Sequence, residues 1–185
     1  DCIGQSIFDR ELANQYSRLT GEVTPPLQPL AVQYADYALW QRDQIDKGNF
    51  RDQIEYWAKQ LAHPLPAKLV LDGQRLDTAS SKKAVRRSIM LPASLTSTLN
   101  ALARQANSTL YVVMLAVFGM FLSAHSDQPD LLVGTPVASR NQPKLENVIG
   151  RFLNTLVLRL DCSGTPSFIN LLETTRQTAM EAFSN

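Results

Sequence analysis

The chain has 185 residues, which suits one domain or parts of two adjoining ones. Hydrophobic residues make up 44% of the sequence and charged residues 19%, as in ordinary globular proteins that bury a core. The 18 Lys and Arg and 17 Asp and Glu give a formal net charge of +1, and this balance offers no broad electrostatic field for nucleic acid or an anionic membrane.

Three helices are predicted in the first third of the chain. Asp1 stands directly before a run in which apolar residues from Ile3 to Leu19 recur close to the helical period. Further helices are expected at residues 32–44 and 50–62, with proline and glycine breaks at their ends. The polar stretch 64–84 is the expected crossover between two lobes. Because the chain starts in mid-motif, we expect it to derive from a longer polypeptide.

The second half mixes strands and helices. Its longest apolar stretch, residues 110–122, is shorter than the about 20 residues that a membrane-spanning helix needs, so it predicts a helix buried on all sides. The expected order is a strand at 84–91, helices at 93–108 and 109–124, strands at 131–137 and 152–161, and a helix at 166–183. This mixture predicts an α/β protein, an α+β layered sandwich of sheet and helices.

No complete catalytic set is visible in the sequence. Cys2 and Cys162 lie at opposite ends, which argues against a disulfide framework and favours a reducing, cytoplasmic location. His63 and His125 have no nucleophile beside them and are interpreted as surface or capping histidines. Two cysteines and two histidines scattered this widely do not predict a metal site.

Two stretches have residue patterns that are unusual for plain scaffold. "YADYALWQR" spaces Tyr34, Tyr37 and Trp40 three residues apart, which fits an aromatic face packed on a core as well as a ligand role. "NVIGRFLNTLVLRL" places Gly150 and Asn154 in a strand-like apolar run. Glycine there indicates a bulge or a close backbone approach, and a buried asparagine must be hydrogen-bonded.

A basic cluster has two interpretations. Lys82, Lys83, Arg86 and Arg87 lie together in "SSKKAVRRS". The simpler interpretation is a solvated loop and strand edge. The functional one is a docking patch for an acidic partner.

The two motifs resemble those of condensation domains in non-ribosomal peptide synthetases. "YADYALWQR" matches Tyr-x-Asp-Tyr-Ala-x-Trp, "IGRFLNTLVLR" matches Ile-Gly-x-Phe-x-Asn-Thr-x-x-x-Arg, and "DLLVGTPVASRN" is similar to the stretch before it. The resemblance implies a partial chloramphenicol-acetyltransferase-like fold. Residues 1–75 would form the C-terminal part of the first lobe and the crossover, and residues 76–185 the N-terminal part of the second lobe.

The resemblance also assigns site residues. Asp1 matches the aspartate of the family signature His-His-x-x-x-Asp-Gly, Cys2 falls on the glycine, and the two histidines would precede the chain. The family aspartate is mainly structural and pairs with an arginine of the second lobe, for which Arg140 is the candidate and Arg151 and Arg159 are weaker ones. Gly150 and Asn154 would lie near the substrate tunnel.

What the family does is implied in the same way. Condensation domains join an acceptor amine to a donor thioester, both carried on the phosphopantetheine arms of carrier proteins, and bind no cofactor of their own. The expected partners are peptidyl or aminoacyl carrier proteins, which Lys82, Lys83, Arg86 and Arg87 would face, and an adjoining adenylation domain. Without a suitable histidine near Asp1, the chain alone is expected to be inactive.

Three alternatives remain open. A condensation-like domain with a degenerate signature serves as a docking platform rather than as an enzyme. Epimerization and heterocyclization domains share the fold, although "IGRFLNTLVLR" favours ordinary condensation. A related acyltransferase would use coenzyme A or a carrier thioester to acylate an alcohol.

Overall fold

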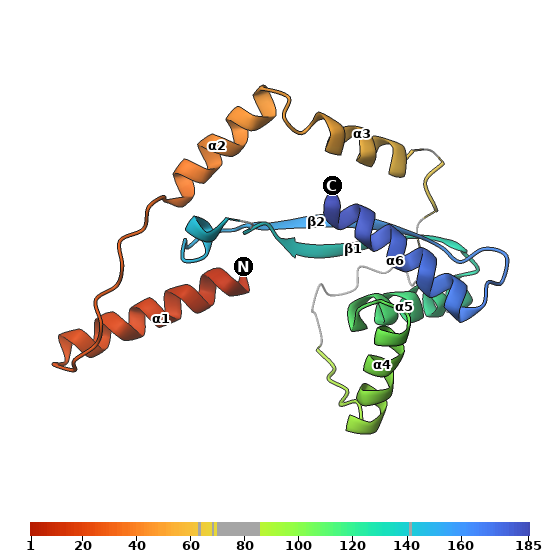
Figure 1. Cartoon of the computed structure of the whole chain (residues 1–185), viewed down its shortest axis with the longest axis horizontal. Helices are drawn as coiled ribbons and strands as arrows, with labels where there is room; N and C mark the ends of the chain where they lie inside the picture. The colour runs from red at the N-terminus through yellow and green to blue at the C-terminus, as the bar shows by residue number, and fades with distance from the viewer. Residues whose placement is uncertain (63, 68, 70–85, 141) are drawn as a thin grey trace, which may run out of the picture. The chain divides into compact units, whose positions relative to one another are not determined.

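A computed structural model describes residues 1–62, 64–67, 69, 86–140 and 142–185 (Figure 1). In these residues six α-helices, a short 3-10 helix and two strands follow one another. Their order is α1 (Cys2–Leu19), α2 (Tyr34–Asp46), α3 (Arg51–Gln60), α4 (Ala93–Gln105), α5 (Leu110–Ser126), β1 (Asp130–Ala138), η1 (Pro143–Leu145), β2 (Leu153–Asp161) and α6 (Phe168–Ser184).

Side-chain caps explain where several helices begin. Asp1, Thr109 and Ser167 accept hydrogen bonds from backbone N–H groups in the first turns of α1, α5 and α6. At the start of α2, the Asp36 carboxylate accepts a 2.8 Å hydrogen bond from the backbone nitrogen of Gln33, as one half of a capping box. The aspartate of "YADYALW" therefore has a local task in starting its helix.

Strands β1 and β2 form a two-stranded sheet. The backbone nitrogen of Ser139 donates to the carbonyl of Phe152, and that of Cys162 donates to the carbonyl of Pro129, at 2.7 Å each. Because a residue that follows β1 pairs with one that precedes β2, and the reverse holds at the other end, the strands are antiparallel. This register brings Asp130 diagonally across from Arg159.

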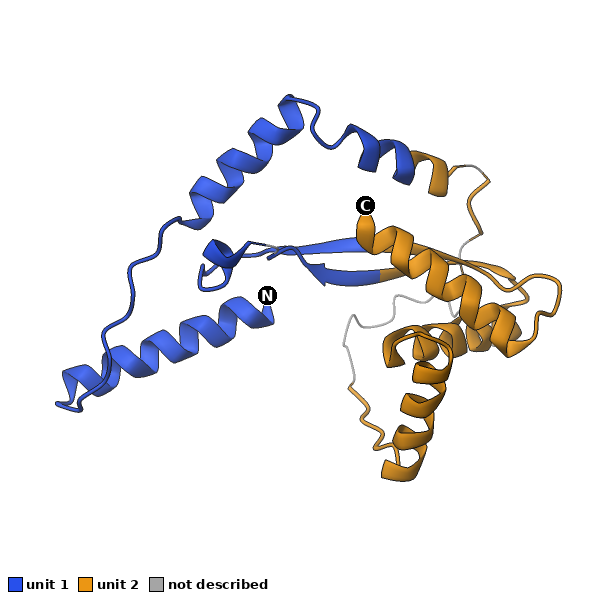
Figure 2. Ribbon diagram, in the orientation of Figure 1, with its two compact units in different colours: residues 1–57, 135–156 blue, residues 58–134, 157–185 orange. Residues whose placement is uncertain are grey.

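The described chain divides into two compact units, residues 1–57 with 135–156 and residues 58–134 with 157–185 (Figure 2). The first has a core of Leu145, Val148 and Phe152, with Leu30, Val32 and Tyr37 packed against it. The second has a larger core from α4, α5 and α6, in which Val113 and Ala116 are fully buried. The unit boundary crosses both strands. The predicted lobe boundary at residues 75 and 76 stays a prediction.

Within the described residues, each predicted helix and the strands predicted at 131–137 and 152–161 are present. The strand predicted at 84–91 is wrong in its described part, because residues 86–92 have no regular structure. Ile89 and Met90 there are 87% and 92% exposed. A strand requires a hydrogen-bonded neighbour, and apolar alternation carries no information on whether one is present.

Burial differs from expectation for two helices. Of the apolar residues predicted on one face of α1, Ile7 is buried, whereas Phe8, Leu12, Tyr16 and Leu19 are exposed. Helix α5, predicted to be buried on all sides, covers one face against α4 and α6 and exposes Tyr111, Met114, Phe118 and Phe121. Within the described residues no single helix is long and apolar enough to cross a membrane; only α4 and α5 together, bent by 101°, have that length and composition.

Candidate functional site: an aspartate–arginine hub in the first unit

Asp1 is the N-cap of α1, and both of its carboxylate oxygens are used. Oδ1 accepts a hydrogen bond from the backbone nitrogen of Gly4 at 2.5 Å, and Oδ2 accepts one from the backbone nitrogen of Phe152 at 3.1 Å. The side chain is 1% exposed. The carboxylate thus joins the start of α1 to a turn 151 residues further along the chain.

The Arg140 guanidinium is held mainly by backbone carbonyls. Nη1 donates to the carbonyls of Leu145 at 2.7 Å and Val148 at 2.8 Å. Nη2 donates to the carbonyl of Gly150 at 3.3 Å and to Asp1 Oδ1 at 3.5 Å. The structure therefore brings Asp1 and Arg140 together as an ion pair at the outer limit of a hydrogen bond, with the shorter Arg140 contacts going to the turn.

Phe152 and burial complete the surroundings of Arg140. The guanidinium carbon lies 4.2 Å from the centroid of the Phe152 ring, a cation–π contact. The Arg140 side chain is 7% exposed, and this burial lowers its pKa from the ordinary value. Nε is buried and has no hydrogen-bond partner among the described residues. We call Asp1, Arg140 and the turn 145–152 the hub.

The chemistry of the hub is structural. Asp1 receives two backbone hydrogen bonds and faces the Arg140 guanidinium, so both of its carboxylate oxygens are already occupied. Arg140 carries its charge at any physiological pH. The hub can fix two backbone segments against each other, but these two side chains do not supply a nucleophile or a base.

Helix α2 packs against the hub through its aromatic motif. The centroids of the Tyr34 and Tyr37 rings lie 5.2 Å and 4.8 Å from that of the Phe152 ring. The centroids of the Tyr37 and Trp40 rings lie 5.8 Å apart. Burial and the neighbouring Tyr34 raise the pKa of Tyr37. Both sequence motifs therefore meet around one phenylalanine. Trp40 remains 42% exposed.

The predicted tunnel residues have different surroundings. Gly150 precedes β2 and lies under the Tyr34 ring, so the close approach expected of this glycine is to a side chain. The prediction that Asn154 is buried is wrong: the residue is exposed, and its Oδ1 accepts a 2.8 Å hydrogen bond from the backbone nitrogen of Thr155. The place of both residues beside a substrate tunnel stays a prediction.

The weaker candidates for pairing with Asp1 lie elsewhere. Arg151 is exposed. Arg159 binds Asp130 through Nε at 3.0 Å and Nη2 at 2.7 Å. Hydrogen bonding to Asp130 raises the pKa of Arg159. The same guanidinium donates to three backbone carbonyls, that of Gln60, the last residue of α3, and those of Ala62 and Pro64 in the segment that follows.

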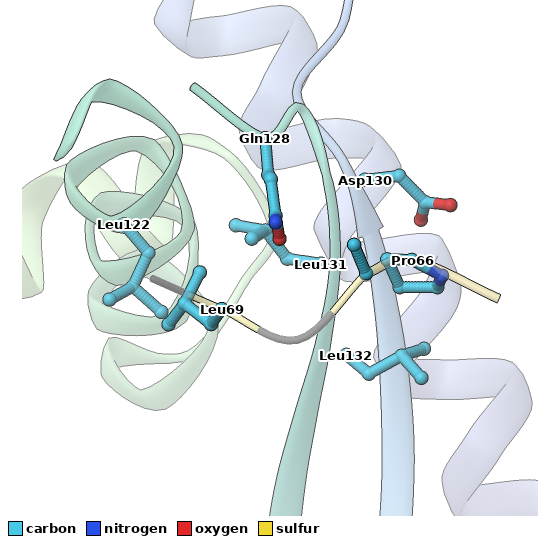
Figure 3. A pocket seen from close by; sticks show the side chains of 8 residues that line it. Pro66, Leu69, Leu122, Gln128, Asp130, Leu131 and Leu132 are labelled. Atoms are coloured by element: carbon cyan, nitrogen blue, oxygen red, sulfur yellow. The ribbon is translucent and has the colours of Figure 1, made fainter. Parts of the chain in front are cut away.

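A small cavity of 130 Å³ lies beside Asp130 (Figure 3). Pro66 and Leu69, which follow α3, line it together with Leu122 of α5 and Asp130 and Leu131 of β1. A second, more open cavity of 440 Å³ lies between α1 and the proline-rich connector of the first unit. Neither of these two cavities is lined by Asp1 or Arg140.

The remaining predicted residues are placed as follows. Arg86 and Arg87 of the basic cluster are exposed, whereas Lys82 and Lys83 lie outside the described residues, as does His63. His125 is exposed, with its ring 4.4 Å from that of Phe121. In the part of the chain that the structure describes, no three His, Cys, Asp or Glu side chains gather where they could hold a metal ion.

The two cysteines differ in surroundings. Cys2, on the position of the family glycine, is exposed on α1. Cys162 follows β2 and is partly buried, and this burial, with Asp161 beside it, raises the pKa of its thiol.

Sequence reasoning missed Gly4 and Asp130. A side chain at Gly4 would place its Cβ 3.0 Å from Asp1 Oδ1 and 3.2 Å from the Gly150 carbonyl, so a small residue is needed where α1 meets the turn. Asp130 precedes the apolar part of β1, where it resembles an ordinary strand-end charge. Only the strand register, which the sequence does not state, brings it to Arg159.

Comparison with known proteins identifies the family. The family model of the condensation domain matches residues 1–185, so the chain belongs to the condensation-domain family. A similar curated protein is a linear gramicidin synthase polypeptide of Brevibacillus parabrevis, 38% identical over 180 residues, which are 97% of this chain and 2% of that protein.

Solved structures show the same fold. The X-domain from teicoplanin biosynthesis matches with a TM-score of 0.85 at 28% identity, over 100% of this chain and 42% of the other. The SgcC5 protein from Streptomyces globisporus matches with a TM-score of 0.81 at 28% identity, over 100% of this chain and 41% of the other. The chain has part of a chloramphenicol-acetyltransferase-like α/β fold and spans about two fifths of these structures.

Proposed function

We propose that this chain is part of a domain that forms amide bonds between carrier-bound acyl groups in non-ribosomal peptide synthesis. The observation that carries the proposal is the hub, in which the aspartate and arginine assigned from the family motifs contact each other at 3.5 Å. Similarity to a gramicidin synthase along 97% of the chain supports the same conclusion.

In the proposed reaction an acceptor amine attacks the carbonyl of a donor thioester. A C–N bond forms and the C–S bond breaks; the amine loses a proton, and the departing thiolate takes one up. Orientation of two tethered reactants can lower such a barrier by about 7–11 kcal/mol, so positioning is the main task of the protein. The hub contributes by fixing the start of α1, where Asp1 matches the signature that carries the family histidines.

The substrates would be the phosphopantetheine arms of two carrier proteins, and the reaction needs no bound cofactor. Carrier proteins are the proposed partners, with an adenylation domain in the same assembly line and a cytoplasmic location. Arg86 and Arg87 are exposed and offer positive charge to an acidic carrier surface. Their contribution would be to the rate of encounter more than to chemistry.

A docking platform is the second candidate. The X-domain of teicoplanin biosynthesis, which matches this chain with a TM-score of 0.79, has been solved as a complex with OxyB. Cys2 in place of the family glycine is the feature of this chain that favours a degenerate signature. A third candidate, an acyltransferase that uses an alcohol, is favoured by SgcC5, whose structure holds a 1,2-ethanediol derivative.

One assay separates these candidates. Donor and acceptor carriers are loaded with an acyl thioester and an aminoacyl thioester and incubated with a polypeptide in which this chain follows a complete family signature, His-His-x-x-x-Asp-Gly. Amide product, detected by mass spectrometry of the carriers, supports condensation; ester product on an alcohol acceptor supports the third candidate. Carrier or protein binding without either product supports the platform.

The chain by itself is a matched control. We expect no amide product from the 185 residues alone, because the sequence has two histidines and neither adjoins the Asp1 motif. Turnover by this chain alone would contradict the proposed dependence on a histidine that precedes Asp1.

A further inference from the structure

Tyr34 occupies the space that a side chain at position 150 would need. A Cβ built on Gly150 would lie 2.7 Å from Cγ and 2.8 Å from Cε2 of the Tyr34 ring, and closer still to Cδ2. The Tyr34 hydroxyl donates a 3.0 Å hydrogen bond to the carbonyl of the next residue, Arg151. One side chain from α2 therefore holds two consecutive residues of the turn.

The same turn supplies most of what holds the hub together. Its carbonyls at Val148 and Gly150 accept from Arg140, and its Phe152 nitrogen donates to Asp1. The contacts at Gly150 and at Asp1 are 3.3 Å and 3.5 Å long, already at the limit of useful hydrogen bonds. A displacement of a few tenths of an ångström in the turn would break these two first.

Arg140 has little else to fix its orientation. Its Nε has no partner among the described residues, so the guanidinium plane depends on the carbonyls of the turn and on the face of Phe152. The Phe152 ring in turn forms a T-shaped pair with the Tyr34 ring, with an interplanar angle of 89°. Tyr34 thus contacts both the turn and Phe152, the two features that orient the Arg140 guanidinium.

We propose that Tyr34 is a positioning residue that braces residues 148–152 of the turn and thereby sets the geometry of the Arg140–Asp1 pair. Gly150 is its counterpart, because only a residue without Cβ admits the ring. As a role in catalysis this inference rests on the proposed function, but the brace itself is a property of the described chain. It gives the motifs "YADYALW" and "IGRF" one shared task.

The brace is tested by the NMR signals of the Arg140 guanidinium. In ¹⁵N-labelled chain, a guanidinium held by several carbonyls gives slowly exchanging, separate Nη–H signals. Tyr34→Leu should merge or broaden these signals while the amide spectrum of α4, α5 and α6 stays unchanged. Tyr34→Phe, which keeps the ring and loses the hydroxyl, should give an intermediate effect. Tyr16→Leu, at a 68% exposed tyrosine on α1, is the matched control.

A double-variant cycle separates the brace from general destabilisation. Gly150→Ala alone should displace the ring and disturb Arg140 strongly. In Tyr34→Ala with Gly150→Ala the clash is gone, so the double variant should resemble Tyr34→Ala rather than show the sum of both effects. Additive effects, or unchanged Arg140 signals in Tyr34→Leu, would overturn the inference.

Activity provides a separate measurement. In a polypeptide that forms amides, Tyr34→Leu should lower kcat by roughly 10–100-fold, as expected for a misplacement of about 1 Å, with KM for the loaded carriers unchanged. An unchanged kcat would refute the catalytic part of the inference. If a polypeptide in which this chain follows a complete family signature forms no amide at all, the proposed function fails, and the NMR result still decides whether the brace exists.

Discussion

Each compact unit contains an arginine–aspartate pair, and the two pairs have opposite surroundings. Arg140 and Asp1 in the first unit have side chains 7% and 1% exposed, with 3.5 Å between Nη2 and Oδ1. Arg159 and Asp130 in the second are 26% and 35% exposed, with 2.7 Å between Nη2 and Oδ2. The more exposed pair has the shorter contact.

Burial explains this difference. The buried Arg140 has three backbone carbonyls around it and shares its donors among them, and desolvation lowers its pKa. Arg159 binds its carboxylate in a forked geometry, which raises its pKa. The short distance therefore does not identify the more important pair. What distinguishes the hub is that water cannot replace a lost partner there.

The largest expected effect is that of Arg140→Ala. Removal of one partner from a buried pair leaves a carboxylate and several carbonyls unpaired, and such changes cost about 3–5 kcal/mol of stability. Urea unfolding followed by circular dichroism measures the free energy of unfolding. In an active polypeptide, amide formation should fall as well.

Two further variants sharpen that experiment. Arg140→Lys keeps the positive charge but offers a single ammonium in place of the planar guanidinium. Its free energy of unfolding should therefore lie between that of Arg140→Ala and that of the native chain. Arg151→Ala, at an exposed arginine in the same turn, is the matched control and should leave stability unchanged. Equal free energies of unfolding for Arg140→Ala and Arg151→Ala would contradict the claim that the buried arginine contributes more to stability than the exposed one.

Local sequence patterns predict the elements well because helix signals are local. The positions of α2, α4, α6 and both strands follow from spacing, caps and breakers within each segment. The pairing of Asp1 with Arg140 follows from family motifs; local pattern alone does not connect residues 139 positions apart.

Sequence patterns fail to predict features that depend on tertiary neighbours, such as the pairing of a strand or the burial of a side chain. The run at 84–91 alternates like a strand, yet its described residues 86–91 pair with nothing in the described chain. The apolar neighbours of Asn154 predict burial, yet this side chain is exposed on β2. The contact of Tyr34 with Gly150 is missed for the same reason: each motif is visible, but their meeting is tertiary.

The second pair should show a smaller and more local effect. In Arg159→Ala the carbonyls of Gln60, Ala62 and Pro64 lose their donor, but water can replace it at this partly exposed site. We expect faster hydrogen exchange at the Ala62 amide and faster thiol labelling of Cys162, with a loss of stability clearly smaller than that of Arg140→Ala.

Arg176→Ala is the matched control for this variant, because Arg176 pairs with Glu173 three residues away on the same helix. It should leave the labelling rate of Cys162 unchanged. If Arg159→Ala destabilised the chain as much as Arg140→Ala, burial would not be what separates the two pairs.

The smallest expected effect is electrostatic and concerns Asp161. Hydrogen bonds from Ser163 lower its pKa, and the charge of Arg159 lowers it further. Because the folded pKa is depressed, the stabilisation is complete above the ordinary aspartate pKa and is lost as the pH falls through the folded pKa. Arg159→Ala should therefore raise the Asp161 pKa in a carboxyl NMR titration, whereas Arg140→Ala should not change it. A shift of the Asp161 pKa in Arg140→Ala would contradict this expectation, because the groups that perturb Asp161 are Ser163 and Arg159.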